Sequence, residues 1–276
     1  MLSDGAEVLD EPTSFGHHPD MIAVPSHHEL FDLTGRVVVV TGASSGLGAR
    51  WAPVLAASGA QVVIAARRHV ELTAVAAQSP NIVAVAGDVT IDADRHRIVD
   101  TALEHFGRID VLVNSAGTAV SAPAIDLELD AFREMIETDL TATFAFTQLV
   151  GQSMLEAGRG SIVNIASLAA ERCLDRYPLI AYNSAKAALV AMTRSLAAEW
   201  GPRGVRVNAV GPAFFPTRLS GFLEDDEQVA WIEGHTALRR SARLDELDGM
   251  IVFLASDASS YVTGQHLVVD GGWSVF

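Results

Sequence analysis

The stretch Arg36-Val-Val-Val-Val-Thr-Gly-Ala-Ser-Ser-Gly-Leu-Gly48 decides the fold. Its four consecutive valines predict a strand buried on both faces, and the apolar segment 47–57 predicts a helix. The turn between them carries Gly42, Gly46 and Gly48, which tolerate positive φ and let a ligand approach the backbone closely. A helix that begins there presents unpaired N–H groups and the positive end of its dipole, which suits a pyrophosphate. The spacing is G-x3-G-x-G rather than the standard dinucleotide fingerprint, and packing alone is the alternative explanation for the glycines.

Further along the chain, short apolar runs alternate with helix-length amphipathic segments. Strands are predicted at 36–41, 61–66, 82–86, 110–114, 161–165, 205–210 and 265–269, and helices at 46–58, 70–78, 92–106, 130–157, 180–201 and 245–255. This alternation predicts an α/β fold with one parallel sheet of about seven strands and helices on both faces. Ligands of such sheets bind beyond the carboxyl ends of the strands, where this sequence places small, polar or turn-forming residues.

We expect a single domain over residues 31–276, preceded by an extension over residues 1–30. The extension holds three prolines and two His-His pairs but little periodicity. Neither pair has spaced partner ligands, so we expect no metal site. Within the domain, the segment 211–244 shows no clear element and is predicted to be a lid over the substrate.

The composition is that of a compact acidic protein. Of 276 residues, 49% are hydrophobic, and the formal net charge is −15. Such a charge argues against nucleic acid or an anionic membrane surface as a partner, and no run of 18 apolar residues predicts a membrane span. Cys173 is the only cysteine, and the acidic N-terminus lacks the features of a signal peptide. We therefore expect a cytoplasmic protein.

A tyrosine and a lysine lie four residues apart in the predicted helix 180–201. Tyr182 and Lys186 therefore share one helical face. Lys186 is the only lysine among 19 lysine and arginine residues, which favours a specific use of its slim ammonium over a surface position. A phenol, with a reference pKa of about 10, becomes a usable acid–base catalyst when a nearby cation favours its ionised form. Ser167, after the strand 161–165, either polarises a substrate carbonyl or serves as a turn or cap residue.

Taken together, the motifs resemble the short-chain dehydrogenase/reductase family over roughly residues 31–276. In chain order they are Thr41-Gly-Ala-Ser-Ser-Gly-Leu-Gly48, Asp88-Val89, Asn114-Ser-Ala-Gly117, Ser167 with Tyr182-x3-Lys186, Asn208-Ala-Val-Gly-Pro212 and Val269-Asp-Gly-Gly272. The resemblance implies a Rossmann-type, doubly wound sheet and hydride transfer between NAD(P) and an alcohol/carbonyl pair. It implies that Tyr182 is the acid/base, that Lys186 binds the ribose and assists the tyrosine, and that Ser167 polarises the carbonyl.

The same resemblance implies which residues bind the coenzyme. Asp88 and Val89 are expected to hold the adenine, Asn114 to Gly117 to line the cleft, and Thr217 to meet the nicotinamide amide. The whole expected set is Gly42, Ser44, Ser45, Gly46, Leu47, Arg67, Asp88, Val89, Asn114, Ala116, Gly117, Tyr182, Lys186, Pro212, Phe215 and Thr217.

At two positions this sequence departs from the family pattern. Asp139 occupies the place of an asparagine that, in the family, helps to hold a proton-relay water near the lysine, and we count it with the catalytic residues. An ionised Asp139 near Lys186 would favour the ammonium and oppose formation of the tyrosinate. The family's Pro-Gly after the sixth strand is Pro212-Ala213 here. Because an alanine does not easily adopt positive φ, this turn is expected to follow a different path.

Coenzyme preference depends on the end of the second strand. NAD-preferring relatives usually have an acidic residue there for the ribose 2′-hydroxyl, whereas this chain has Ala66 followed by Arg67 and Arg68. An arginine can bind a 2′-phosphate through two hydrogen bonds, so NADP is favoured and NAD remains the alternative. Ser45, where many NADP-dependent relatives carry a basic residue, counts against NADP.

Two classes of function follow. The leading hypothesis is an oxidoreductase acting on a secondary alcohol or ketone, similar either to 3-oxoacyl thioester reductases or to gluconate 5-dehydrogenases and other polyol or sugar-acid dehydrogenases. The second is a dinucleotide-binding regulator with impaired catalysis, motivated by Asp139 and Ala213; the intact Ser167, Tyr182 and Lys186 argue against it. The family resemblance also implies a homotetramer.

Overall fold

The computed structural model describes residues 24–174, 176–219 and 225–276 and contains one parallel seven-stranded sheet. Its strands run in the order β3-β2-β1-β4-β5-β6-β7. They are β1 (Val37–Thr41), β2 (Gln61–Ala66), β3 (Ile82–Ala86), β4 (Val111–Asn114), β5 (Gly160–Ile165), β6 (Val205–Pro212) and β7 (His266–Val269). The predicted fold class is confirmed. The order reverses direction between β1 and β4, which is where ligands of doubly wound sheets bind.

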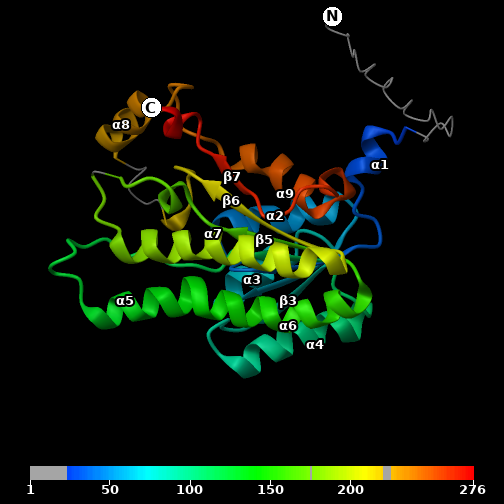
Figure 1. Ribbon diagram of the computed structural model, residues 1–276. Coiled ribbons are helices and arrows are strands. Elements are labelled where there is room, and N and C mark those ends of the chain that lie inside the picture. The colour runs from blue at the N-terminus through cyan, green and yellow to red at the C-terminus, as the bar shows by residue number, and fades with distance from the viewer. Residues whose placement is uncertain (1–23, 175, 220–224) are drawn as a thin grey trace, which may run out of the picture.

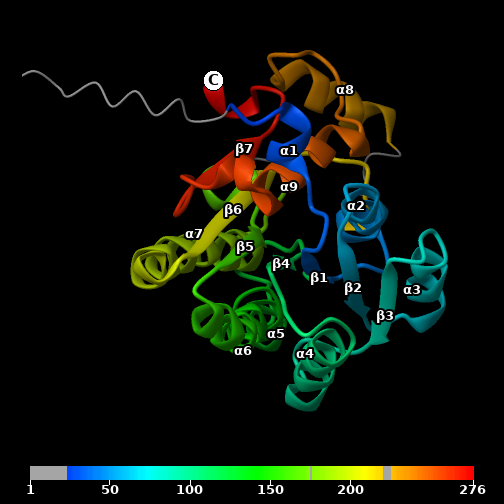
Figure 2. The same cartoon turned by 90° about the vertical axis from the view of Figure 1, so that its right-hand side faces the viewer.

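Helices cover both faces of the sheet (Figures 1 and 2). The α-helices of the described residues are α1 (His27–Phe31), α2 (Gly46–Ala57), α3 (His69–Ala76), α4 (Asp92–Phe106), α5 (Leu129–Ile136), α6 (Ala142–Ala157), α7 (Ile180–Trp200), α8 (Asp226–His235) and α9 (Asp248–Ala255). Figure 2 places α4, α6 and α7 on one face of the sheet and α2 and α9 on the other.

The two largest hydrophobic clusters follow from the alternation of side chains along each strand. In β1, Val38 and Val40 pack in the core formed with α2, α3 and α9, whereas Val39 packs in the core formed with α4, α6 and α7. Every residue of β1 is buried. A strand enclosed on both faces needs apolar side chains at every position, which explains the run of four valines.

Some elements differ from the sequence-based prediction. The segment 211–244 contains α8, whose N-cap Asp225 accepts hydrogen bonds from the N–H groups of Glu227 and Gln228. This helix has only Ile232 buried, so its sequence carries little helical periodicity. The short helix α1 lies partly within the predicted extension, and Ser26 caps it. Residues 1–23 of that extension and 220–224 of the predicted lid lie outside the described residues.

The predicted helix 130–157 is interrupted near its middle. The five residues Glu137–Thr141 form a π-helical turn between α5 and α6. The extra residue in a π-turn changes which side chains face inward, and such turns occur frequently at functional sites. Here the side chain that the turn buries is Asp139.

Candidate active site

A cavity of about 590 Å³ lies at the carboxyl ends of the strands. Segments that follow six strands contribute to its lining, as the sequence predicted for a ligand site at this edge. The expected coenzyme residues that line it are Gly42, Ser44, Ser45, Gly46, Leu47, Arg67, Asp88, Val89, Ala116, Gly117, Tyr182, Lys186, Pro212, Phe215 and Thr217. The cavity also borders Ser167 and Asp139. Residues far apart in sequence therefore meet around one space.

The glycine-rich turn brings β1 against the end of β4. Gly42 has a φ of +69°, and a Cβ on it would lie 2.6 Å from the Ser115 carbonyl oxygen. Thr41 Oγ1 accepts hydrogen bonds from the N–H groups of Ser115 and Ala116, both at 3.1 Å. Only glycine fits position 42, because any side chain would strain the backbone and collide with the neighbouring strand end.

The first turn of α2 faces the same cavity, and the residues present fit a pyrophosphate. The helix begins at Gly46, and the side chain of its N-cap Ser45 makes no capping hydrogen bond. The N–H groups of the first turn are therefore not capped by a side chain, and they carry the positive end of a twelve-residue helix dipole.

Two arginines follow β2, and they behave differently. Arg68 donates from Nε and Nη2 to Ser44 Oγ at 3.1 and 2.9 Å, and from Nη2 to Ser45 Oγ at 2.6 Å. Arg67 is exposed, with Nη1 3.7 Å from Asp88 Oδ2. Arg68 lines the cavity but was not among the expected site residues. Its position directly after Arg67 is the only sequence signal that could have identified it.

Asn114 is the one expected coenzyme residue that does not line the cavity. Its side chain is buried, and Nδ2 donates to Thr147 Oγ1 at 2.8 Å and to Asn164 Oδ1 at 2.9 Å. Asn164 in turn donates to Thr193 Oγ1 at 2.9 Å. This network joins β4 and β5 to α6 and α7, so Asn114 stabilises the frame of the site from within the core.

Tyr182 and Lys186 project from one face of α7, as their spacing predicts. The Lys186 ammonium lies 5.5 Å from the centroid of the Tyr182 ring. Lys186 Nζ also donates to the Ile165 carbonyl oxygen at 3.0 Å and pairs with Asp139 Oδ2 at 3.0 Å. The backbone N–H of Thr118 donates to the other carboxylate oxygen of Asp139 at 2.9 Å. The only lysine of the chain is thus held by a carboxylate and a carbonyl.

The Asp139–Lys186 pair is almost completely enclosed, with side-chain exposures of 0% and 6%. Burial by itself lowers the pKa of Lys186, but the Asp139 carboxylate, with a contribution from Tyr182, outweighs burial and raises that pKa above its usual value. The ammonium form is therefore favoured, as the sequence predicts for an aspartate close to this lysine.

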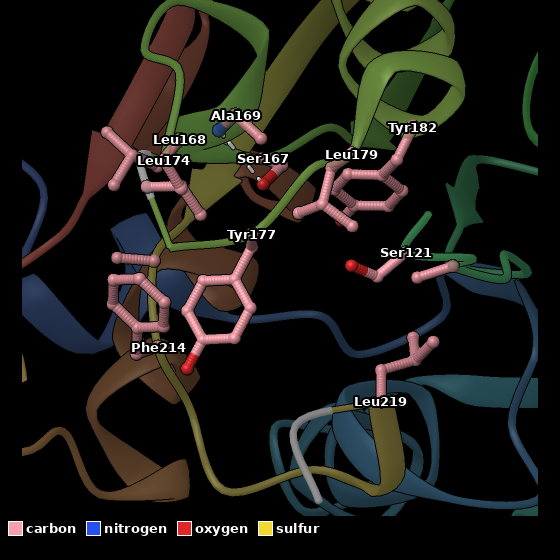
Figure 3. Close-up of a pocket in the computed structure, with 12 residues that line it drawn as sticks. Ser121, Ser167, Leu168, Ala169, Leu174, Tyr177, Leu179, Tyr182, Phe214 and Leu219 are labelled. Atoms are coloured by element: carbon pink, nitrogen blue, oxygen red, sulfur yellow. Dashed lines mark hydrogen bonds between the residues drawn. The ribbon is translucent and has the colours of Figure 1, made fainter. Parts of the chain in front are cut away.

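Ser167 serves as a cap residue and also borders the larger cavity. Its Oγ accepts a hydrogen bond from the Ala169 N–H at 3.1 Å and so caps the short 3-10 helix Leu168–Ala170 (Figure 3). The same residue borders the 590 Å³ cavity. Because the hydroxyl accepts in its capping bond, its proton is still available to a ligand oxygen.

A second cavity, of about 210 Å³, adjoins the first. Four residues border both: Ser167, Tyr182, Ala213 and Leu219. Elsewhere the smaller cavity is bordered by leucine, alanine, serine and aromatic residues of the segments 119–121, 168–179 and 213–219 (Figure 3). The two cavities therefore meet at the serine and the tyrosine that the sequence singles out.

The segment after β6 has no positive φ at Ala213. Among the described non-glycine residues only Arg239 has positive φ, so Ala213 does not adopt the conformation that glycine permits. Its N–H instead donates to the Val269 carbonyl oxygen at 3.1 Å and continues the pairing of β6 with β7. The alanine thus borders both cavities without backbone strain.

Within ranges 24–174, 176–219 and 225–276, no group of three or more histidine, cysteine, aspartate or glutamate side chains is arranged to hold a metal ion. In the same part of the chain, none of the helices combines the length and apolarity needed to cross a membrane.

Comparison with known proteins finds relatives along nearly the whole chain. A family model described as enoyl-(acyl carrier protein) reductase matches residues 42–274. A D-threitol dehydrogenase from Mycolicibacterium smegmatis is 40% identical and covers 89% of this chain and 95% of that protein. An NAD-dependent glycerol dehydrogenase from Listeria innocua is 34% identical, with coverages of 89% and 96%. The crystal structure of a gluconate 5-dehydrogenase from Burkholderia cenocepacia, in complex with NADP and tartrate, has a TM-score of 0.85 at 33% identity and covers 90% of this chain and 99% of that one. The chain therefore belongs to the short-chain dehydrogenase/reductase family.

Proposed function

We propose that this protein is an NAD(P)-dependent oxidoreductase that interconverts a secondary alcohol and a ketone. The observation that carries the proposal is the junction of the two cavities at Ser167 and Tyr182. A coenzyme along the larger cavity and a substrate in the smaller one would meet at these two side chains.

Each side chain at the junction has a distinct task in the proposed reaction. A nicotinamide held in the larger cavity would supply or accept the hydride. Ser167 donates a hydrogen bond to the substrate oxygen, and Tyr182 gives that oxygen a proton during reduction or removes it during oxidation. Lys186, whose ammonium Asp139 and the Ile165 carbonyl hold in place beside the Tyr182 ring, binds the ribose. The glycine-rich turn and the first turn of α2 hold the pyrophosphate.

We propose NADP as the preferred coenzyme, with NAD as the alternative. Support comes from Ala66, which places no carboxylate at the end of β2, and from two arginines beside the cavity. Arg68 is occupied by Ser44 and Ser45, whereas the exposed Arg67 makes one long contact with Asp88. We therefore assign the 2′-phosphate to Arg67 and support of the turn to Arg68.

Arg67→Ala is expected to weaken NADP binding by roughly tenfold to a hundredfold, the value of a lost charge-assisted hydrogen bond, and to leave NAD binding nearly unchanged. Calorimetric titration with each coenzyme measures both effects. Arg68→Ala is the comparison, and it should weaken both coenzymes because it releases the turn at Ser44 and Ser45. Equal losses for the two coenzymes in Arg67→Ala would refute the assignment.

Asp139→Asn is expected to move the alkaline limb of the kcat/KM profile to lower pH. With the carboxylate present, the raised pKa of Lys186 preserves the ammonium until the pH rises through that value. Without it, burial, which is already the largest single influence, is no longer offset by the carboxylate and lowers the pKa of Lys186, so the ammonium is lost earlier as the pH rises. Steady-state rates from neutral to alkaline pH test the shift. An unchanged alkaline limb would show that the Asp139–Lys186 pair does not control the ionisation on which kcat/KM depends.

We further propose a cytoplasmic homotetramer. The single cysteine supports a reducing compartment. Exposed apolar side chains on α6 (Phe144), on α7 (Ile180) and at the C-terminus (Phe276) support contacts with other copies of the chain. The names of the relatives make polyols and a sugar acid candidate substrates for this chain. The sequence adds 3-oxoacyl thioesters.

A panel of secondary alcohols and ketones, assayed with NADP(H) and NAD(H), tests the proposed function. We expect turnover of part of the panel, followed by the change in absorbance of the reduced nicotinamide, and higher kcat/KM with NADP(H). Binding of both coenzymes without turnover across the panel would instead favour the dinucleotide-binding regulator.

A further inference from the structure

The smaller cavity has no cationic side chain in its described lining. Its polar side chains are those of Ser121, Ser167, Tyr177 and Tyr182, and the others are leucine, alanine and phenylalanine. Positions 175 and 220–224, which lie outside the described residues, contain neither lysine nor arginine in the sequence. A carboxylate placed in this cavity would lose its water without gaining a positive partner.

Three arginines that are close in sequence to the cavity lining lie outside that lining. Arg172 Nη2 donates to the Ser274 carbonyl oxygen at 2.9 Å. Arg176 contacts the Glu227 carboxylate at 3.4 Å, and its guanidinium lies 5.2 Å from the centroid of the Trp231 ring. Arg218 is exposed and borders the larger cavity, not the smaller one. None of the three therefore contributes to the lining of the substrate cavity.

Few hydroxyls are left to pair with a polar substrate. The Tyr177 hydroxyl donates to Gln228 Oε1 in α8 at 2.7 Å, and burial raises the pKa of Tyr177, so the phenol stays neutral. Ser167 and Tyr182 are assigned to the reacting oxygen. Ser121 is then the remaining hydroxyl of the described lining (Figure 3). A substrate with many hydroxyls would leave several of them without partners, which is costly.

Packed aromatic rings hold the apolar wall in place. Phe214 borders the cavity, and its ring centroid lies 4.8 Å from that of Trp273 and 6.1 Å from that of Trp231 in α8. Trp231 also contacts Tyr177, at 5.9 Å, and Trp273, at 4.8 Å. This cluster joins α8 to the C-terminal residues behind the wall. An aromatic wall supported in this way favours an apolar ligand surface.

We propose that the substrate is an uncharged ketone or secondary alcohol with an apolar body, and that sugar acids and other carboxylates are excluded. The inference rests on the proposed function, because it takes the smaller cavity as the substrate site. The cavity volume of about 210 Å³ suits a small molecule.

Levulinate and its methyl ester form a matched pair, because both are small ketones and only the acid is charged. We expect kcat/KM with NADPH to be roughly a hundredfold higher for the ester, the effect of burying an unpaired carboxylate. The kcat/KM for cyclohexanone is likewise expected to exceed that for erythrulose, a ketone that carries several hydroxyls. A kcat/KM for levulinate equal to or greater than that for its ester would overturn the exclusion of carboxylates. A kcat/KM for erythrulose equal to or greater than that for cyclohexanone would overturn the proposal that the substrate has an apolar body.

Calorimetric binding of the same ketones, with oxidised coenzyme present, separates this inference from the proposed function. Binding of the ester but not of levulinate supports the inference even if no ketone is reduced, in which case the proposed function fails alone. Tighter or equal binding of levulinate overturns the inference whatever the turnover. Absence of binding by every ketone also overturns it, because the cavity would not be a ketone site.

Leu174→Arg tests directly whether carboxylates are excluded because the cavity lining lacks a cation. Leu174 borders the cavity, and an arginine there would supply the partner that a carboxylate lacks. We expect the ratio of levulinate to ester kcat/KM to rise by at least about tenfold in Leu174→Arg and to stay unchanged in Leu174→Gln, a polar but uncharged control. Equal ratios in the two variants would overturn the charge argument.

Discussion

Tyr182→Phe is expected to lower kcat by about a hundredfold to ten-thousandfold, the range that general acid–base catalysis contributes. The substitution removes one oxygen and leaves in place the ring, which packs against the cluster of Met135, Ala181 and Ala185. Coenzyme affinity should remain almost unchanged because the turn at Gly42 and the first turn of α2 are untouched. Reduced-nicotinamide absorbance gives kcat, and calorimetry gives the coenzyme Kd.

Tyr261→Phe is the matched control, because it removes the same atom from a fully exposed ring. It should leave both kcat and coenzyme affinity as they are. Turnover near the wild-type rate in Tyr182→Phe would remove Tyr182 from the acid–base role. A parallel loss of coenzyme affinity would indicate that the hydroxyl supports binding instead of proton transfer.

Lys186→Met is expected to abolish turnover and to lower the free energy of unfolding by about 3–5 kcal/mol. Both effects follow from the buried ion pair. Methionine fills a similar volume but leaves the Asp139 carboxylate without its cation in a site with no exposure. Urea denaturation, with the far-ultraviolet circular dichroism as probe, measures the stability loss.

The double variant Lys186→Met/Asp139→Asn separates folding from catalysis. The asparagine removes the unpaired charge and can still accept the Thr118 N–H, so most of the lost stability should return. Turnover should not return, because the ammonium beside Tyr182 is still missing. Recovery of activity together with stability would mean that Lys186 has only a structural role.

Much of the frame was predictable because burial on both faces leaves a clear mark in a sequence. The valine run of β1 and the apolar runs of the other strands predicted all seven strands of the sheet within a few residues. The ends of those runs then indicated the edge at which the site lies, because ligands of parallel sheets bind at the carboxyl ends. The role of Gly42 was predictable for a related reason, because only glycine tolerates both the φ at that position and the close approach of the neighbouring strand end.

Contacts between distant segments were harder to predict from the sequence. Nothing in the sequence near Arg68 shows that its guanidinium binds Ser44 and Ser45 of the preceding turn. The π-turn at Glu137–Thr141 has no distinct periodicity, although the unusual residue Asp139 pointed to the place. The helix α8 depends on its cap and on aromatic contacts with residues near the C-terminus, which local propensity does not report.

The most direct test of the account is transfer of deuterium from NADPH labelled at the reactive carbon of the nicotinamide to a ketone substrate, detected by mass spectrometry of the alcohol product. We expect the label on the carbinol carbon with the wild-type protein and almost none with Tyr182→Phe at the same coenzyme occupancy. Bound coenzyme with no label in the product of any ketone, for the wild-type protein, would contradict the proposal that the two cavities form one oxidoreductase site.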